Sequence, residues 1–146
     1  MKFIFRAVFL LPISIILGLG AASVQPQQKS SADQDVNRGR YLVEEVAKCP
    51  ECHTPRNENH ELDPDRWLQG ATIWIQPAFK TTNWADFAPP LAGLANYTDD
   101  QVEQVLEKGQ GASGRGPIQP PMHIYHLNHA DAKAIIAYLR SLSGHR

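Results

Sequence analysis

The residue types and spacing best suited to chemistry lie in one pentapeptide, Cys49 to His53, which reads C-P-E-C-H. Two thiols three positions apart can each add to a vinyl group of a haem, and the imidazole that follows can bind the haem iron from one side. Few other chemistries need this spacing. The pentapeptide therefore predicts one covalently attached haem c, with Cys49 and Cys52 as attachment points and His53 as the proximal iron ligand.

Three other uses of these cysteines agree less well with the sequence. A disulfide between Cys49 and Cys52 would close a very short loop and remove little entropy from the unfolded chain. A thioredoxin-like redox site needs a strand that leads into a helix, and no strand alternation surrounds Cys49. A zinc site would need two of His123, His126 and His129, which lie far beyond the ~12–15-residue gap of a zinc finger. Haem attachment is the prediction we retain.

The candidate for the second axial ligand is Met122, the only methionine apart from the initiator. It ends the run from Gly116 to Met122, whose prolines hold the backbone extended and exclude a helix. A methionine that only fills a core more often lies on a helix stripe. We therefore predict that Met122 binds the iron opposite His53. The alternative ligands are His123 and His126, because imidazole also binds haem iron well.

Ligation by one histidine and one methionine fills all six positions of the iron. Such an iron has no site for oxygen or a substrate, so we expect the transfer of single electrons between redox partners and do not expect an enzyme. The thioether also favours ferrous iron and raises the reduction potential. The alternative is a haem protein with an open sixth position that binds a gas or peroxide. Carbon monoxide distinguishes the two, since it leaves a fully ligated iron unchanged.

The N-terminus predicts export from the cytoplasm. Residues 1–22 combine a basic start, an apolar stretch and a small-residue site that ends at Ala22, which is typical of a signal peptide. Residues 23–33 are rich in Gln, Ser and Ala and are expected to form a flexible linker. We predict a periplasmic protein, because haem attachment at this motif requires reduced thiols outside the cytoplasm. An uncleaved leader would instead be a membrane anchor, although its apolar stretch is marginal against the ~20 residues that span a bilayer.

Residues 34–146 have the length of one small domain, and they contain no internal repeat and no second C-x-x-C-H motif. One domain should carry one haem. The formal net charge of −1 gives no reason to expect binding to nucleic acid or to an anionic membrane surface. The expected partners are redox proteins, a dehydrogenase or an oxidase. Lys48, Glu51 and Arg56 mix both signs of charge near the motif, so we expect no strong electrostatic steering of that partner.

Hydrophobic periodicity predicts three helices separated by long loops. The second helix has a capping box at its start and a glycine at its end, and the third has an acidic residue in its first turn. The one β-like run, residues 72–75, is brief and is expected to be an extended loop. The predicted helices run from about Asp35 to Cys49, from Thr98 to Gly109, and from Asn128 to Gly144.

The chain resembles the small monohaem class I cytochromes c of the bacterial periplasm. The resemblance spans essentially the whole domain and rests on the segments 39–42, 49–56, 120–122 and 131–139. It implies an all-α cytochrome c fold, with three main helices and long loops wrapped around one haem. In that family the first and last helices cross with a small residue against an aromatic one, and Gly39 and Tyr138 fit those places. A Pro-rich loop before the last helix supplies the axial methionine, which matches Met122.

Further predictions concern the surroundings of the haem. A backbone carbonyl fixes the proximal imidazole in that family, and Pro64 lies at about the right distance along the chain to supply it for His53. Arg56 is a candidate partner of a haem propionate. Four aromatic side chains are candidates for the walls of the pocket: Trp67, Trp74, Trp84 and Tyr97. The remaining histidines, His60, His129 and His145, are expected to be exposed or to cap helices.

Overall fold

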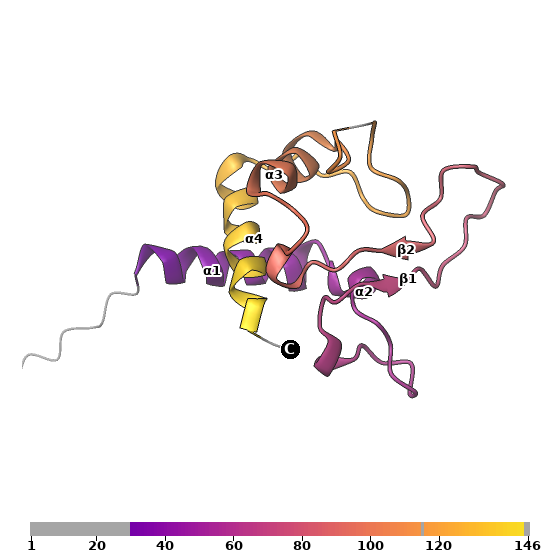
Figure 1. Cartoon of the computed structure of the whole chain (residues 1–146), viewed down its shortest axis with the longest axis horizontal. Helices are drawn as coiled ribbons and strands as arrows, with labels where there is room; N and C mark the ends of the chain where they lie inside the picture. The colour runs from indigo at the N-terminus through magenta and orange to yellow at the C-terminus, as the bar shows by residue number, and fades with distance from the viewer. Residues whose placement is uncertain (1–29, 115, 145–146) are drawn as a thin grey trace, which may run out of the picture.

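The computed structural model describes residues 30–114 and 116–144. Its three longest helices are α1 (Ser31–Tyr41), α3 (Asp99–Lys108) and α4 (His129–Ser141), and a short helix, α2 (Pro50–His53), follows α1 (Figure 1). Strands β1 (Ala71–Thr72) and β2 (Phe87–Ala88) form one antiparallel pair. A π-helical segment (Leu42–Val46) and three 3₁₀ turns (Pro64–Arg66, Ala92–Leu94 and Leu142–Gly144) complete the regular structure of the described residues.

The predicted signal peptide, residues 1–22, and residues 23–29 of the predicted linker lie outside the described residues. Helix α1 begins at Ser31, ahead of the predicted start at Asp35, so the end of the predicted linker is helical. The cause is a side-chain cap, because the hydroxyl of Ser30 accepts a hydrogen bond from the backbone N–H of Asp33. In the part of the chain that is described, no helix has the length and apolar character needed to cross a membrane.

Local caps set the bounds of α3 and α4 as predicted. Thr98 and Gln101 form a reciprocal capping box at the start of α3. Gly109 ends that helix in a left-handed conformation, with φ 64°, which a residue with a Cβ adopts only under strain. The side chain of Asn128 accepts a hydrogen bond from the backbone N–H of Asp131 and so begins α4. These elements therefore follow from residues near their own ends.

The crossing of α1 and α4 depends on Gly39. A Cβ atom at this position would lie 1.9 Å from the carbonyl oxygen of Ala134 and 2.8 Å from the Cβ of Tyr138. Only glycine lets the two backbones approach this closely. The predicted contact between Gly39 and Tyr138 is confirmed, and Figure 1 shows α4 passing across α1.

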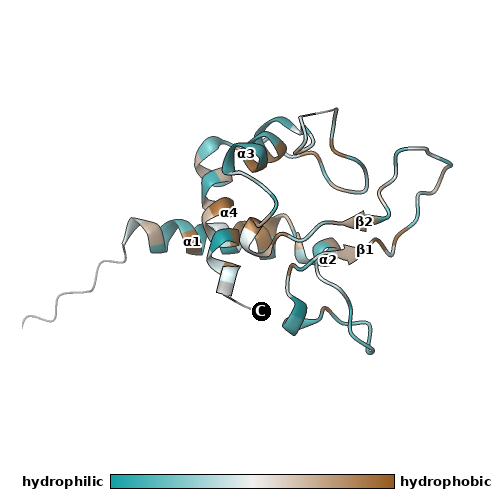
Figure 2. Cartoon of the chain, viewed as in Figure 1, coloured by the Kyte–Doolittle hydropathy of each residue, from teal (hydrophilic) through white to brown (hydrophobic). Residues whose placement is uncertain are grey.

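The apolar core lies where α4 meets the other elements. Figure 2 shows apolar, brown residues along α4, whereas much of the surface of α3 is hydrophilic and teal. Helix α3 buries only Val102 and Leu106, and residues of the π-helical segment and of two loops fill the rest. The buried core residues are Leu42, Val43, Leu68, Leu94, Val102, Leu106, Ala132, Ile135, Ile136, Tyr138 and Leu139.

The fold is helical but not purely so, because β1 and β2 pair in the region expected to be only extended loop. Ala71 pairs with Ala88, and Thr72 pairs with Phe87. A strand of two residues is too short to produce a period-two pattern, which is why the sequence gives no sign of it. The pair matters for function, since it joins two distant loops next to α2.

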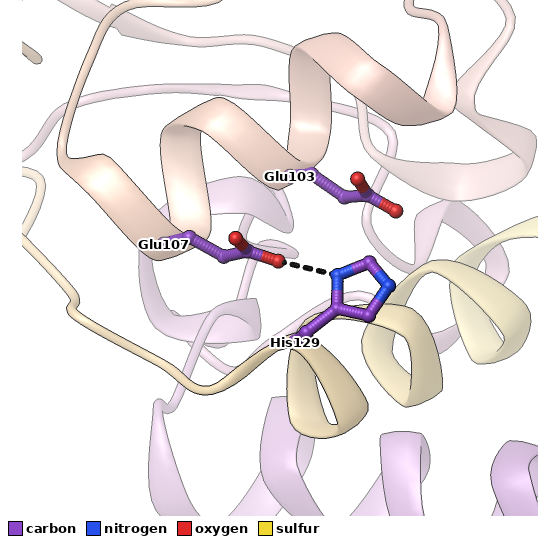
Figure 3. A group of neighbouring side chains, drawn as sticks. All are labelled: Glu103, Glu107 and His129. Atoms are coloured by element: carbon purple, nitrogen blue, oxygen red, sulfur yellow. Dashed lines mark hydrogen bonds and ion pairs between the residues drawn. The ribbon is translucent and has the colours of Figure 1, made fainter.

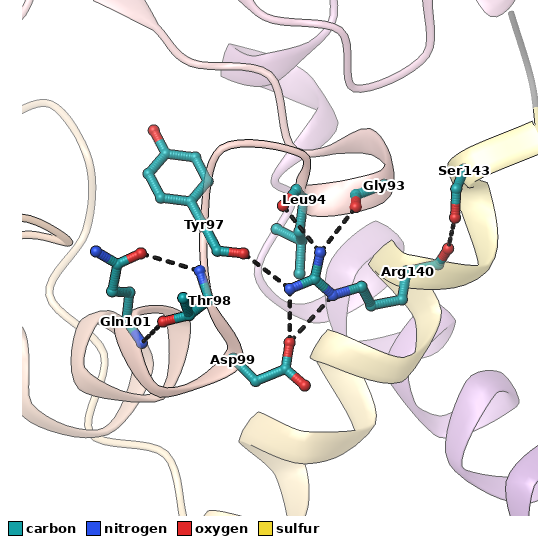
Figure 4. A network of polar contacts seen from close by, with 8 residues as sticks. All are labelled: Gly93, Leu94, Tyr97, Thr98, Asp99, Gln101, Arg140 and Ser143. Carbon is teal, nitrogen blue, oxygen red and sulfur yellow. Dashed lines mark hydrogen bonds and ion pairs between the residues drawn. The ribbon is translucent and has the colours of Figure 1, made fainter.

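Arg140 of α4 holds the segment that leads into α3 (Figure 4). Its guanidinium donates hydrogen bonds to the backbone carbonyls of Gly93 and Leu94 at 3.0 and 2.9 Å. It also donates to the carbonyl of Tyr97 and to the carboxylate of Asp99, the latter at 2.7 Å. The planar guanidinium can donate to several acceptors at once, so it takes the place of backbone hydrogen bonds where the chain turns and has no regular secondary structure.

Candidate functional site

The first helix ends before the C-P-E-C-H motif, not at Cys49 as predicted. The N–H of Ala47 bonds to the carbonyl of Leu42 at 2.8 Å, which widens the last turn into a π-helix. Lys48 then adopts a positive φ of 53°, and the N–H of Cys49 reaches back to the carbonyl of Val43 at 3.0 Å. Single π turns of this kind are frequent at functional sites. The wide turn redirects the chain so that α2 begins as a separate helix.

Helix α2 contains Cys52, and Cys49 is the residue just before it, so the two cysteines lie one turn apart on the same side. Both thiols are free and half-buried. Burial raises the pKa of the Cys49 thiol to about 11. Burial also raises the pKa of Cys52, and the nearby carboxylate of Glu51 adds to the effect. Because both thiols are free and lie on one side of α2, the two side chains can attach to the same group.

His53 is buried, with 6% of its surface exposed, and its Nδ1 lies 2.7 Å from the carbonyl oxygen of Pro89. A carbonyl can only accept, so Nδ1 carries the proton and Nε2 keeps its lone pair. Burial lowers the pKa of the imidazole, although the Pro89 carbonyl works in the opposite direction. A neutral imidazole with one fixed nitrogen and one free nitrogen is the arrangement found in metal-binding histidines.

The prediction of Pro64 as the partner of His53 was wrong, because the carbonyl comes from Pro89. Two contacts bring Pro89 to this place. The N–H of Gly70 bonds to the carbonyl of His53 at 2.8 Å, and the next residue, Ala71, pairs with Ala88. The strand pair thus places the residue after β2 beside the imidazole.

Thr54, the residue after His53, connects the site to a second loop, and its role was not predicted from the sequence. Its side chain is 2% exposed, and its hydroxyl accepts a hydrogen bond from the N–H of Leu68 at 3.0 Å. The carbonyl of Leu68 in turn accepts from the N–H groups of Leu91 and Ala92. This network ties the loop after α2 to the segment just beyond Pro89, which holds the carbonyl in place.

Met122 lies half-buried in the segment between α3 and α4. Two residues earlier, the carbonyl of Pro120 accepts a hydrogen bond from the N–H of Ala85 at 2.7 Å, which joins this segment to the loop between β1 and β2. The alternative ligands His123 and His126 are both exposed. The burial of the three side chains therefore favours Met122.

Tyr125 is a residue of this site that sequence reasoning missed. Its hydroxyl donates a hydrogen bond to the carbonyl of Ala47 at 3.1 Å. Its pKa is raised to about 12, mainly by burial and further by the neighbouring Cys49 and Cys52. The one available signal was its position three residues after Met122. The side chain links the segment that carries Met122 to the motif that carries the thiols.

The residues predicted to surround the haem do not form one group. Trp67 and Tyr97 pack against the core, and the indole N–H of Trp84 donates to the carbonyl of Ile75 at 3.3 Å. The guanidinium of Arg56 lies 5.2 Å from the ring centre of Trp74 and 3.1 Å from a carboxylate oxygen of Glu51. Arg56 and Trp74 are thus the two that lie together beside α2.

Large apolar side chains flank both halves of the site and remain exposed. Val46, just before the motif, is 57% exposed, and Ile124, just after Met122, is 48% exposed. Single exposed apolar side chains are normal on a protein surface, but beside two free thiols they are suited to contact an apolar group. Free thiols on one face, a metal-competent imidazole and these apolar flanks are the donor set and the surface that a haem requires, so the residues fit that group.

The sequence profile of the family described as Cytochrome c matches residues 36–143. The chain is 39% identical to the fructose dehydrogenase cytochrome subunit of Gluconobacter japonicus over 114 residues, which is 75% of this chain and 22% of that protein. It is 31% identical to the gluconate 2-dehydrogenase cytochrome c subunit of Pantoea cypripedii over 142 residues, 90% of this chain and 32% of that protein. The chain thus spans between about a fifth and a third of the length of these relatives.

Proposed function

The chain belongs to the cytochrome c family, which binds haem c and transfers electrons, and on that premise we propose that it carries one haem c attached through Cys49 and Cys52. His53 is the proposed proximal ligand and Met122 the proposed sixth ligand. When bound, the haem supplies an iron that alternates between the ferrous and ferric states. The protein is a carrier of single electrons and catalyses no reaction of its own.

The observation that carries this proposal is the hydrogen bond between Nδ1 of His53 and the carbonyl of Pro89, at 2.7 Å. It fixes the ring and leaves Nε2 unprotonated, which is what a proximal ligand needs. A buried histidine in a core often has one such bond for structural reasons alone. Here the same helix also carries two free thiols, which a structural histidine does not explain.

Met122 is supported as the sixth ligand by its burial and its connections. It is the most buried of the three candidates. The loop that carries it is fixed by the hydrogen bonds of the Tyr125 hydroxyl and of the Pro120 carbonyl. A thioether from a fixed loop binds without a large loss of side-chain freedom. If His53 and Met122 held the iron from its two sides, no position would remain for oxygen, which separates this function from that of a gas-binding or peroxide-binding haem protein.

The proposed partner is a dehydrogenase that passes electrons to this protein. The support comes from the relatives, which are named as cytochrome subunits of a fructose dehydrogenase and a gluconate 2-dehydrogenase. The proposed location is the periplasm, reached through the signal peptide at residues 1–22. An oxidase is the corresponding candidate for the electron acceptor.

The test is to produce the full chain, with its leader, in a bacterium that matures c-type cytochromes. We expect haem to stay with the protein band after acid–acetone extraction and denaturing electrophoresis, at one haem per chain. The reduced spectrum should not change under carbon monoxide. Extraction of the haem would contradict covalent attachment at Cys49 and Cys52, and rapid carbon monoxide binding would favour an open sixth position instead.

A further inference from the structure

A second group of metal-binding side chains lies away from the haem motif, between α3 and the start of α4 (Figure 3). Glu103 and Glu107 are separated by one turn of α3, and His129 is the first residue of α4. One donor atom from each of the three lies within 4.8 Å of the other two. The group differs from an ordinary acidic surface because an imidazole from a second helix faces the two carboxylates.

The charges around this group are unbalanced. Glu103 and Glu107 are half-buried and line a surface hollow of about 240 Å³ together with Asp100, Gln104 and Lys108. Carboxylates one turn apart on a helix repel each other. In the described part of the chain, no hydrogen bond or ion pair is found for the carboxylate of Glu103, and none joins Lys108 to either glutamate. A bound cation would offset this repulsion.

The distances in the group lie on both sides of the spacing expected between ligands of one ion. Nδ1 of His129 lies 2.9 Å from a carboxylate oxygen of Glu107. Bonds of ~2.0–2.2 Å from zinc to nitrogen and oxygen place neighbouring ligands of a tetrahedral site roughly 3.4 Å apart. The donor oxygen of Glu103 lies within 4.8 Å of both other donor atoms, and in the described part of the chain no hydrogen bond or ion pair holds this carboxylate elsewhere. The ion would take the place of the proton that His129 shares with Glu107.

We propose that Glu103, Glu107 and His129 bind one divalent transition-metal ion of the zinc type. The imidazole selects this class, because calcium and magnesium prefer oxygen ligands alone. The site joins the end of α3 to the start of α4, and these are the two ends of the segment that carries Met122. The N–H of Leu127 already bonds to the carbonyl of Leu106 there, at 3.0 Å. The ion adds a second connection across the base of the same segment.

The test is equilibrium dialysis of the haem-loaded protein against zinc chloride, with magnesium and calcium chloride in parallel. We expect one zinc site whose affinity falls at least tenfold in each of the variants Glu103→Gln, Glu107→Gln and His129→Gln. Glu103→Gln is the most direct of the three, because no hydrogen bond or ion pair is found for the wild-type carboxylate among the described residues. Zinc should also raise the melting temperature of the wild type and not of these variants, because a ligand that binds only the folded state stabilises it.

Two matched controls should bind zinc as the wild type does. His60→Gln removes an exposed imidazole and Glu58→Gln removes an exposed carboxylate, both in the loop that follows α2. Unchanged zinc affinity in all three site variants would overturn the proposal. It would also be overturned if calcium bound as tightly as zinc and only the glutamine replacements at Glu103 and Glu107 reduced binding, because the imidazole would then not be a ligand. The haem spectrum reports separately on Cys49, Cys52, His53 and Met122.

Discussion

The hydroxyl of Tyr125 and the carbonyl of Ala47 are joined by a hydrogen bond of 3.1 Å. Ala47 belongs to the wide turn just before Cys49, and Tyr125 follows Met122 by three residues. One contact therefore links the segment that carries the proposed sixth ligand to the segment that carries the thiols. The two segments are otherwise separated by most of the folded chain.

Replacing Tyr125 by phenylalanine removes this hydrogen bond and keeps the ring. We expect the free energy of unfolding to fall by ~1 kcal/mol, because the carbonyl of Ala47 loses its partner. In the haem-loaded protein the ferric methionine–iron absorption should also weaken at a lower denaturant concentration than in the wild type. The control is Tyr41→Phe, since Tyr41 is exposed and should leave both measurements unchanged. An unaltered denaturation midpoint in Tyr125→Phe would show that the contact does not hold the segment.

Gly39→Ala should damage the crossing of α1 and α4. The added Cβ would meet the carbonyl oxygen of Ala134 at 1.9 Å, so the helices would have to separate. We expect a loss at the upper end of the ~1–3 kcal/mol typical of overpacking, measured by chemical denaturation. Gly111→Ala is the control, because a Cβ there finds its nearest atom at an ordinary 3.5 Å. Equal stability of the two variants would mean that the crossing adapts easily.

Arg140→Ala should destabilise the segment before α3. The carbonyls of Gly93, Leu94 and Tyr97 lose a charged donor in this variant. We expect a fall of about 2–3 kcal/mol in the free energy of unfolding, in line with hydrogen bonds to charged groups. Arg38→Ala is the matched control, since Arg38 forms an exposed pair with Asp131 and lies 5.8 Å from the exposed ring of Tyr41, and its loss should change stability much less. Similar losses in the two variants would contradict a special role for the guanidinium of Arg140.

What the sequence predicted well depends on residues close together in the chain. The capping box at Thr98 and the stop at Gly109 are local signals, and both are confirmed. The Gly39–Tyr138 contact is not local, and it was predicted because the family resemblance adds what periodicity lacks. The roles of Cys49 to His53 and of Met122 rest on motif and position, and they stay predictions that the haem experiments test.

The features that the sequence did not predict depend on contacts between distant residues or on unusual backbone conformations. The prediction of Pro64 rested on chain distance alone, whereas a two-residue strand pair brings the carbonyl of Pro89 to His53. The early end of the first helix depends on the positive φ of Lys48, and lysine gives no sequence sign of such a conformation. Tyr125 lies in a segment without periodicity, where no pattern shows which side chain turns inward.

Alkaline pH should weaken the contact between α4 and the segment after α1 through Tyr138. Its hydroxyl donates a hydrogen bond to the carboxylate of Glu44, and its pKa is raised from 10 to about 12, first by burial and then by this bond. Below pH 10 the hydroxyl is protonated in both the folded and the unfolded chain, so this stabilisation is complete. Between 10 and about 12 the unfolded chain loses the proton first, and the free energy of unfolding falls as pH rises.

Denaturation of the wild type and of Tyr138→Phe, from about pH 8 upward, measures this effect. The difference in stability between the two proteins should shrink as pH passes 10 and approaches 12. Comparison of the two proteins removes the contribution of Tyr125, whose pKa is also raised to about 12. If the two stability curves stayed parallel over this range, ionisation of Tyr138 would not be the cause.

Met122→Ala should open the sixth position of the iron. Without the thioether, the ferric protein should take up water or added ligands, and the reduced protein should bind carbon monoxide. The reduction potential should drop by on the order of 0.1 V, a part of the ~0.8 V that axial ligands span, because a harder ligand favours ferric iron. The control variants His123→Ala and His126→Ala remove exposed side chains and should keep the wild-type spectrum and potential. If Met122→Ala stayed inert to carbon monoxide while one histidine variant became reactive, that histidine would be the ligand, and the protein would be a carrier of lower potential with two axial histidines.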